Sequence, residues 1–256
     1  MVEITLHLDK SVEQNAEVYY EKSKRLKKKI AGIQAIISKT KKQLGELQER
    51  KEKKIQESNK PVRKKAWYEK FRWFVSSEGF LVIGGRDATT NEIVIKKHTE
   101  PTDIVFHTDM AGSPFFVVKS EGKTIGKDTL SEVADATFTF SRAGKSEITT
   151  SQVFYVNPDQ VTKTPNAGES LPKGAFVIRG KTNYIENKWN IAVGLYESAL
   201  MAAPLESVKK HCEKYLVLQK GEKKPSDVAK MVRKLIGGEL DEIIRALPSS
   251  NLNIKK

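Results

Sequence analysis

Cysteine is almost absent from this sequence, since Cys212 is the one thiol among 256 residues. A single cysteine excludes an intrachain disulfide and a cysteine-based metal cluster, and it is typical of a reducing compartment. Long apolar runs are also lacking, because no stretch approaches the ~18 uninterrupted apolar residues of a membrane span. Residues 1–10 do not contain the apolar segment of a secretory signal. We therefore expect a soluble cytoplasmic protein without a membrane partner.

Histidines are few, and none of the four is paired with another at zinc-site spacing on a predicted helix. The glycines do not have the spacing of a phosphate-binding loop or a dinucleotide fingerprint. One pair has catalytic potential: His107 and Asp109 fall on one face of a predicted strand and could hold a metal or shuttle a proton. A histidine hydrogen-bonded at a strand end is the more common arrangement. We predict a protein that is not an enzyme, without catalytic residues, metal or cofactor; a metal-dependent hydrolase or nuclease is the alternative.

Positive charge is concentrated near the start of the chain. The formal net charge is +13, and residues 10–72 hold 20 Lys and Arg against 8 Glu, a local net charge of +12. Such an excess favours a polyanionic partner, either nucleic acid or an anionic membrane. Residues 11–57 lack the bulky apolar face of an interfacial helix, which favours RNA. A solvated helix whose charges only maintain solubility fits equally well.

A long helix is predicted over residues 11–57, which contain no proline. Ser11 and Gln14 have the spacing of a capping box at its start. Its apolar stripe is thin and needs a partner; the stripe comprises Leu26, Ile30, Ile33, Ile37, Leu44 and Leu47. Pro61 breaks this helix, and a second helix is predicted over residues 62–75 from the spacing of Trp67, Phe71 and Phe74. Residues 1–75 are therefore predicted to form a basic coiled-coil helical hairpin.

After Gly79 the pattern changes to short strands, turns and helices. Strands are predicted at residues 80–83, 92–97, 103–107, 115–119, 153–156 and 175–179. A helix capped by Asp128 is predicted over residues 128–140. The last part is expected to contain a helix over 205–215, a strand over 216–219, and helices from near Ser226 and Leu240. The predicted fold class is α+β, a mixed sheet with packed helices, with domains over residues 76–200 and 201–256.

Two clusters carry the residue types that bind RNA. Lys96, Lys97 and His98 stand together at the end of the strand predicted over 92–97. Arg179 and Lys181 are followed closely by Asn183 and Tyr184, which add a polar amide and a ring that can stack on a base. Cations bind phosphates without regard to sequence, whereas aromatic rings stack on unpaired bases. These cations and Arg86 are predicted phosphate contacts.

Several short words of the sequence occur in a characteristic order. They are WYEKF (67–71), SSEGF (76–80), IGGRD (83–87), NE (91–92), DIVFHTD (103–109), GS (112–113) and KGAFVIRGK (173–181). Together they resemble the NFACT family. Residues 67 to about 190 are similar to its RNA-binding NFACT-R domain, and Asn15-Ala16 with Tyr19-Tyr20 resembles the opening of its coiled coil. At Gly144 the chain departs from the family, whose members commonly carry tryptophan there.

The resemblance implies a role in ribosome-associated quality control. Full-length members bind the large ribosomal subunit, contact ribosomal RNA and ribosomal proteins, and recruit tRNA. This sequence does not show the family's N-terminal domain, so we expect either a naturally short, archaeal-type member or a part of a longer one, and tRNA recruitment and tail synthesis are not assigned to it. Site residues are expected among the family words, namely Gly84, Gly85, Asp87, Asp103, His107, Asp109, Gly112 and Ser113. Of these, Asp103, His107 and Asp109 are expected to hold the turn that presents the Gly112–Ser113 backbone. A further alternative is an interaction scaffold whose helical arm binds another protein.

Overall fold

The structure, a computed structural model, describes residues 3–58, 63–146, 151–165 and 170–255, and side chains within the first helix only as far as residue 48. The chain divides into two compact units, Met1–Lys64 and Lys65–Lys256. Over the described ranges, no helix is both long enough and apolar enough to cross a bilayer. The break predicted at Pro61 lies outside the described residues.

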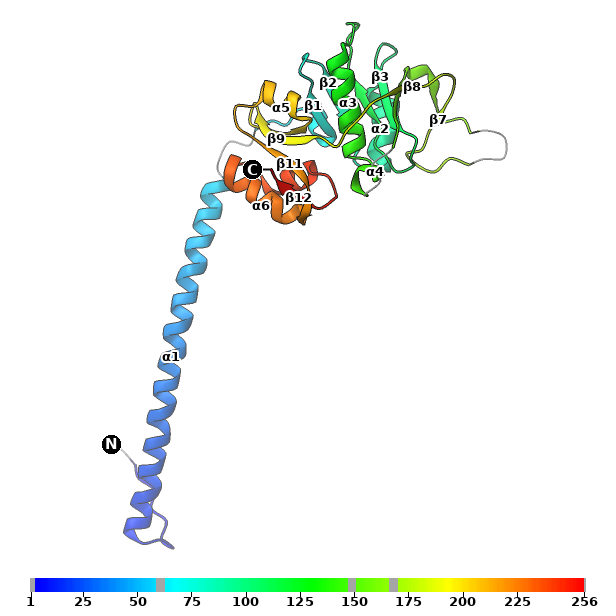
Figure 1. Ribbon diagram of the computed structural model, residues 1–256. Coiled ribbons are helices and arrows are strands. Elements are labelled where there is room, and N and C mark those ends of the chain that lie inside the picture. The colour runs from blue at the N-terminus through cyan, green and yellow to red at the C-terminus, as the bar shows by residue number, and fades with distance from the viewer. Residues whose placement is uncertain (1–2, 59–62, 147–150, 166–169, 256) are drawn as a thin grey trace. The chain divides into compact units, whose positions relative to one another are not determined.

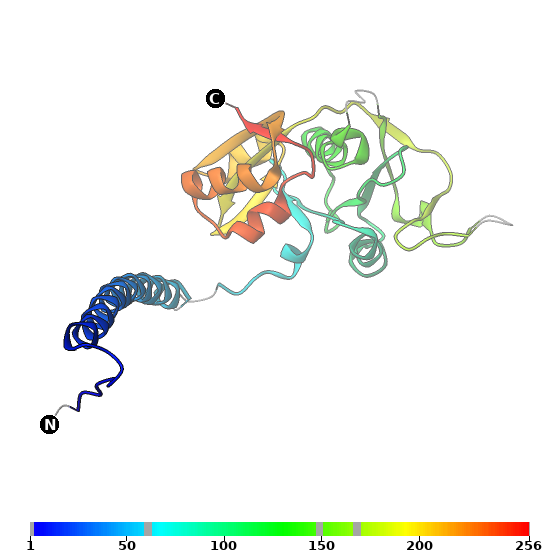
Figure 2. The same cartoon turned by 90° about the horizontal axis from the view of Figure 1, so that it is seen from below.

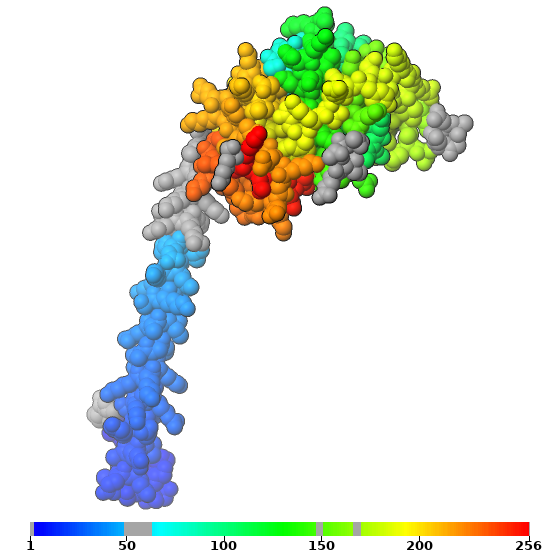
Figure 3. All heavy atoms as spheres, viewed as in Figure 1, coloured from blue at the N-terminus to red at the C-terminus, as the bar shows by residue number. Residues whose placement is uncertain are grey.

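The first unit is one long helix, α1 (Val12–Ser58), as predicted (Figure 1). Its capping box is confirmed, because the Gln14 backbone N–H donates to the Ser11 Oγ at 3.2 Å and the Ser11 N–H donates to the Gln14 side chain at 3.0 Å. The buried Asn15 side chain accepts from the backbone N–H of His7 at 2.8 Å and ties the preceding turn to the helix. The apolar stripe from Leu26 to Leu47 is exposed. Figure 3 shows side chains projecting along α1 in the coloured part of the helix, which ends at residue 48.

The prediction of a second helix over residues 62–75 is wrong in the part of this range that the structure describes. Trp67–Lys70 is a single 3-10 turn, η1, and Arg72–Val75 is a strand, β1. Strand β1 pairs antiparallel with β2 (Leu81–Gly84), which itself matches the predicted strand. Both Phe71 and Phe74 are fully buried, so their helical spacing arises from a turn followed by a strand inside a core. The described part of residues 1–75 therefore contains one long helix and not a helical hairpin.

A six-stranded antiparallel sheet organises the second unit, with the order β1-β2-β4-β3-β5-β8. Its remaining strands are β3 (Ile104–Thr108), β4 (Phe116–Val118), β5 (Val153–Val156) and β8 (Asn183–Ile185). Helices α2 (Ala88–His98) and α3 (Lys127–Thr139) cover its two faces (Figure 2). The predicted strands at 103–107, 115–119 and 153–156 and the α+β class are confirmed.

Three local predictions between residues 87 and 179 need correction. Residues 92–97 lie in α2 and not in a strand, because Asp87 caps the helix by accepting from the Thr90 N–H at 2.8 Å. Helix α3 begins after Gly126, and Asp128 stands in its first turn without capping it. The strand predicted over 175–179 is limited to β7 (Val177–Ile178), which pairs with β6 (Val161–Thr162). A short 3-10 turn, η2 (Pro158–Gln160), precedes β6.

A second, four-stranded sheet has the order β10-β9-β11-β12. It comprises β9 (Ile191–Tyr196), β10 (Ala199–Ala203), β11 (Tyr215–Lys223) and β12 (Leu252–Ile254). The helices predicted in this region are present as α5 (Leu205–His211), α6 (Pro225–Ile236) and α7 (Leu240–Ala246). Strands β8, β9, β10 and β12 were not predicted. The predicted boundary between the domains 76–200 and 201–256 falls inside strand β10. Residues on both sides of this boundary therefore contribute to one sheet.

Gly144 lies in the four-residue helix α4 (Arg142–Lys145). A Cβ atom at this position would stand 2.2 Å from the backbone oxygen of Phe138. The short helix therefore packs its backbone directly on the end of α3, and this conformation has no room for any side chain at residue 144. A tryptophan there requires a different local backbone.

Candidate nucleic-acid interface

A cavity of about 610 Å³ brings together residues from three loops of the second unit. The loop between β2 and α2 supplies Gly85, Arg86 and Asp87, and the segment after β3 supplies Asp109, Gly112 and Ser113. His107, within β3, and the backbone around Gly174 complete the walls. Most of the residues expected from the family words thus line one cavity, although they are far apart in the chain.

The imidazole of His107 holds the turn that follows β3. Its Nε2 lies 3.2 Å from the Ser113 carbonyl oxygen, which can only accept, so Nε2 carries the proton. The ring stacks on Phe115 at a centroid distance of 4.1 Å. Thr108 and Ser113 are in hydrogen-bond contact through their hydroxyl groups. Gly112 has a φ of +89°, a left-handed conformation that favours glycine at this point of the turn.

Asn91 connects helix α2 to the same turn and was not predicted as a site residue. Its amide donates to the Ser113 carbonyl at 3.4 Å, and its Oδ1 accepts from the Phe115 N–H at 3.1 Å. The side chain is buried against Gly85, where a Cβ would stand 1.8 Å from the Asn91 Oδ1. Asn91 occurs in one of the family words, but no spacing in the sequence indicates that it is buried.

Arg86 and Asp87 have structural partners in the cavity wall. The Arg86 Nη2 donates to the carbonyl oxygens of Phe71 at 2.8 Å and Glu69 at 3.2 Å, so this cation is only partly available to a phosphate. Hydrogen bonding from the Thr90 backbone lowers the pKa of Asp87, which is consistent with its role as a helix cap.

Lys96, Lys97 and His98 lie at the C-terminal end of α2, outside the cavity. Lys96 forms an ion pair with Glu92 at 2.6 Å. Lys97 is exposed and has no side-chain partner among the described residues. His98 stacks on the half-exposed Trp67 at a centroid distance of 4.6 Å. Burial, followed by the charges of Lys70, Lys119 and Lys97, lowers the pKa of His98 and leaves the imidazole neutral at pH 7.

Arg179 and Lys181 form a second exposed cluster beside β7 and β8. The Gln160 amide donates to the carbonyl oxygens of both residues at 2.9 Å and fixes the loop between them. Tyr184 is 54% exposed, and its hydroxyl donates to the Asp109 Oδ1 at 3.2 Å. Tyr184 therefore links this cluster to the edge of the cavity.

Asp103 lies at the opposite end of β3 from the Gly112–Ser113 turn. Its buried carboxylate accepts from Lys119 at 2.5 Å and from the backbone N–H groups of Glu100 at 2.8 Å and Ser120 at 3.1 Å. It thus fixes the loop before β3, whereas His107 alone of the three expected residues bonds the Gly112–Ser113 turn directly.

His107 should make the fold sensitive to acid. Burial lowers its pKa below the usual 6.5, so the native state binds fewer protons than the unfolded state as the pH falls. We expect the free energy of unfolding to decrease below about pH 6.5, with a slope approaching ~1.4 kcal/mol per pH unit from this residue. Denaturant unfolding between pH 7.5 and 5 measures the slope, and His107→Gln should flatten it. Parallel profiles for the two proteins would contradict this.

The second unit, an α+β unit, exposes cations and half-exposed aromatic rings in two surface clusters, an arrangement suited to binding single-stranded or loop RNA. The family model "NFACT protein RNA binding domain" matches residues 70–180. The chain is 40% identical to the archaeal Rqc2 homolog aRqcH of Methanocaldococcus jannaschii over 214 residues, covering 80% of this chain and 32% of that protein.

Eukaryotic relatives give the same result. Identity to ribosome quality control complex subunit NEMF of Homo sapiens is 37% over 174 residues, covering 67% of this chain and 16% of that protein. Identity to the NEMF homolog of Drosophila melanogaster is 41% over 125 residues, covering 48% and 12%. Residues 70–180 are an NFACT-R domain, and homology to aRqcH and NEMF covers most of the chain. The chain spans about a third or less of the length of these relatives.

One solved structure is also similar, the C-terminal part of the fibronectin/fibrinogen-binding protein from Streptococcus suis. It covers 70% of this chain and 77% of that chain at 18% identity, with a TM-score of 0.39.

Proposed function

We propose that this protein binds RNA and docks on the large ribosomal subunit in ribosome-associated quality control, acting in the cytoplasm. The observation that carries the proposal is the pair of surface clusters that combine exposed cations with half-exposed aromatic rings beside an NFACT-R domain, Lys97 with Trp67 in one cluster and Arg179, Lys181 and Tyr184 in the other. The relatives named for ribosome quality control support the process. Its partners would be ribosomal RNA, ribosomal proteins and, in the same complexes, tRNA.

Gradient sedimentation of a cell lysate tests the docking. The tagged protein should migrate with the large subunit at low salt and be released by higher salt or by RNase, because phosphate contacts weaken as salt rises. A protein that stays at the top of the gradient under every condition would contradict docking while leaving the RNA-binding test below unaffected.

Charge reversal tests the RNA contacts directly. The triple variant Lys97→Glu, Arg179→Glu, Lys181→Glu should weaken binding to a single-stranded RNA at least tenfold. It should also reduce the slope of log K against log salt by about 2, since each lost phosphate contact removes ~0.7 from the slope. Fluorescence anisotropy at several salt concentrations measures both quantities. Lys234→Glu on α6 is the matched control for a single exposed charge. Unchanged affinity and slope in the triple variant would rule out this interface.

We propose that the site is not catalytic. His107 and Asp109 are bonded to different partners, the Ser113 carbonyl and the Tyr184 hydroxyl, respectively. Over the described part of the chain, no group of three or more His, Cys, Asp or Glu residues could hold a metal ion. Metal-dependent cleavage of RNA or peptidyl-tRNA that is abolished in His107→Ala would establish the alternative, a hydrolase.

The exposed stripe of α1 favours a second function, as an interaction scaffold. Leu26, Ile30 and Ile37 are each about half exposed, and a helix of this kind gains stability when an apolar partner covers it. A complex formed through α1 that survives nuclease treatment, and is lost when Ile30 and Ile37 are changed to Glu, would support the scaffold function.

A further inference from the structure

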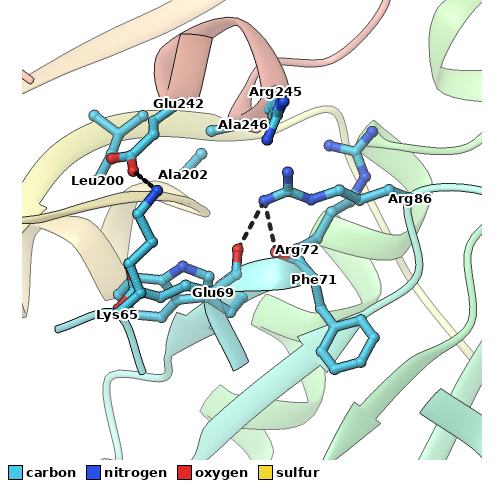
Figure 4. Close-up of a pocket in the computed structure, with 11 residues that line it drawn as sticks. Lys65, Glu69, Phe71, Arg72, Arg86, Leu200, Ala202, Glu242, Arg245 and Ala246 are labelled. Carbon is cyan, nitrogen blue, oxygen red and sulfur yellow. Dashed lines mark hydrogen bonds and ion pairs between the residues drawn. The ribbon is translucent and has the colours of Figure 1, made fainter. Parts of the chain in front are cut away.

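A second cavity, of about 60 Å³, is lined by three arginines from different parts of the second unit (Figure 4). Arg72 comes from β1, Arg86 follows β2, and Arg245 comes from α7 near the end of the chain. Arg245 lies outside the residues matched by the NFACT-R model, so the cavity joins this domain to the C-terminal helices. Arg72 and Arg86 also line the larger cavity.

The charges of this small cavity are not balanced by the residues that line it. Lys65 is its fourth cation, and the two lining carboxylates belong to Glu69 and Glu242. Glu242 is ion-paired with Lys65, and a Glu69 oxygen accepts from the backbone N–H of Ala66 at 2.6 Å. The lining therefore carries two positive charges in excess.

Two of the arginines that line this cavity have buried donors without a partner. Among the described residues, the Arg72 side chain has no hydrogen bond or ion pair, and its guanidinium lies on the ring of Phe140 at 4.1 Å from the centroid. The Nη1 of Arg72 and the Nε of Arg86 are buried without a partner. Arg245 is exposed and likewise makes no side-chain hydrogen bond within the described part of the chain. Unpaired donors on buried cations are costly, and an anion offsets that cost.

The pKa values of the arginines reflect mutual repulsion between their guanidinium groups. Burial, followed by the charge of Arg86, lowers the pKa of Arg72 to about 9. Burial and then the charge of Arg245 lower the pKa of Arg86. Each guanidinium is thus close enough to the next to destabilise its charged form.

We propose that the Arg72–Arg86–Arg245 cavity binds a phosphate group. Guanidinium groups present forked donors that match phosphate oxygens, and their binding is strongest where water is excluded. A buried water needs roughly 10–15 Å³, so a cavity of about 60 Å³ has room for a tetrahedral oxyanion but not for a nucleobase. The phosphate is free inorganic phosphate or the end of an RNA, and only the second source depends on the proposed function.

Thermal unfolding of the full chain with inorganic phosphate, compared with chloride at equal ionic strength, tests the site. The wild type should be stabilised saturably by phosphate, because a ligand that binds only the native state raises Tm. Arg245→Gln should weaken the apparent phosphate affinity about tenfold through the loss of a charge-assisted contact. Without phosphate, the same variant should unfold at an equal or higher temperature, because it removes repulsion from Arg86. A merely structural arginine would lower Tm in both buffers.

Two further variants complete the experiment. Arg72→Met keeps an unbranched stem against Phe140 and should abolish the phosphate effect; if it does not fold, the exposed Arg245 decides the test alone. Arg233→Gln on α6 removes an exposed arginine outside the cavity and should behave as wild type. Equal stabilisation by phosphate and chloride, or a wild-type phosphate response in Arg245→Gln, would overturn the proposal.

The source of the phosphate is read from RNA oligomers that carry a 5′-phosphate or a 5′-hydroxyl. A preference for the 5′-phosphate that disappears in Arg245→Gln assigns the site to an RNA end. Equal binding of the two oligomers, together with a retained response to inorganic phosphate, assigns it to free phosphate. If the wild type binds neither RNA oligomer, this result counts against the proposed function. The measurement with inorganic phosphate remains valid in that case.

Discussion

Replacing Asp103 with alanine should lower the free energy of unfolding by about 3–5 kcal/mol, the cost of breaking a buried ion pair by removing one partner. The Asp103 side chain is fully buried and Lys119 is 10% exposed, with 2.5 Å between the carboxylate and the Nζ. The carboxylate also accepts from the backbone of Glu100 and Ser120. Its loss would leave two backbone donors and a largely buried ammonium group without this partner.

Denaturant unfolding of the wild type, of the single variants Asp103→Ala, Asp103→Asn and Lys119→Met, and of the double variant measures this effect. Asp103→Asn keeps an oxygen that can accept from the backbone N–H groups. It should therefore lose less free energy of unfolding than Asp103→Ala. In the double variant Asp103→Ala, Lys119→Met no cation is left behind, so its loss should be smaller than the sum of the two single losses. Simple additivity, or a loss below about 1 kcal/mol in Asp103→Ala, would show that the pair does not stabilise the loop before β3.

Gly85→Ala should destabilise the second unit by about 1–3 kcal/mol and weaken RNA binding at the same time. The added Cβ would stand 1.8 Å from the Asn91 Oδ1 and 2.9 Å from the Asn91 Cα, so the side chain and the helix backbone must both move. Because Asn91 bonds to Ser113 and Phe115, that movement displaces the wall of the cavity. Thermal unfolding and RNA anisotropy report the two effects.

Gly45→Ala provides a control of opposite sign. Gly45 lies within α1, and nothing stands within 4 Å of a Cβ built there. Alanine should therefore stabilise α1 by up to about 1 kcal/mol and leave the cavity unchanged. A Gly85→Ala variant with wild-type stability would mean that Asn91 does not pack against this glycine as described.

Local signals were sufficient where a segment's own residues determine its conformation. The long helix α1 follows from the absence of proline, the spacing of its apolar residues and the capping box at Ser11 and Gln14. Strands β2 to β5 follow from short apolar runs between turns, because strands buried on both faces read as continuous apolar segments.

Other elements depend on distant pairing. The segment Ala199–Ala203 has weak strand propensity, but it becomes β10 because β9 pairs with it in a buried sheet. Residues 72–75 have aromatic neighbours at helical spacing, yet they form β1 because β2 satisfies their backbone groups. The wrong strand prediction at 92–97 has a different cause. The cap of helix α2, from Asp87 to Thr90, is local in the sequence, but the β-branched residues of the segment are typical of a strand and led to the wrong assignment.

By itself, the sequence determined the charge distribution, the long helix, the α+β class and the family words that mark Gly85, His107 and Ser113. Only the tertiary structure decided that Asn91 joins these words into one cavity wall and that Arg72, Arg86 and Arg245 meet in another cavity. The physical reason is that a side chain's partners depend on which strands and helices pack together. Residues as distant as 72 and 245 line one cavity, and this juxtaposition leaves no periodic trace along the chain.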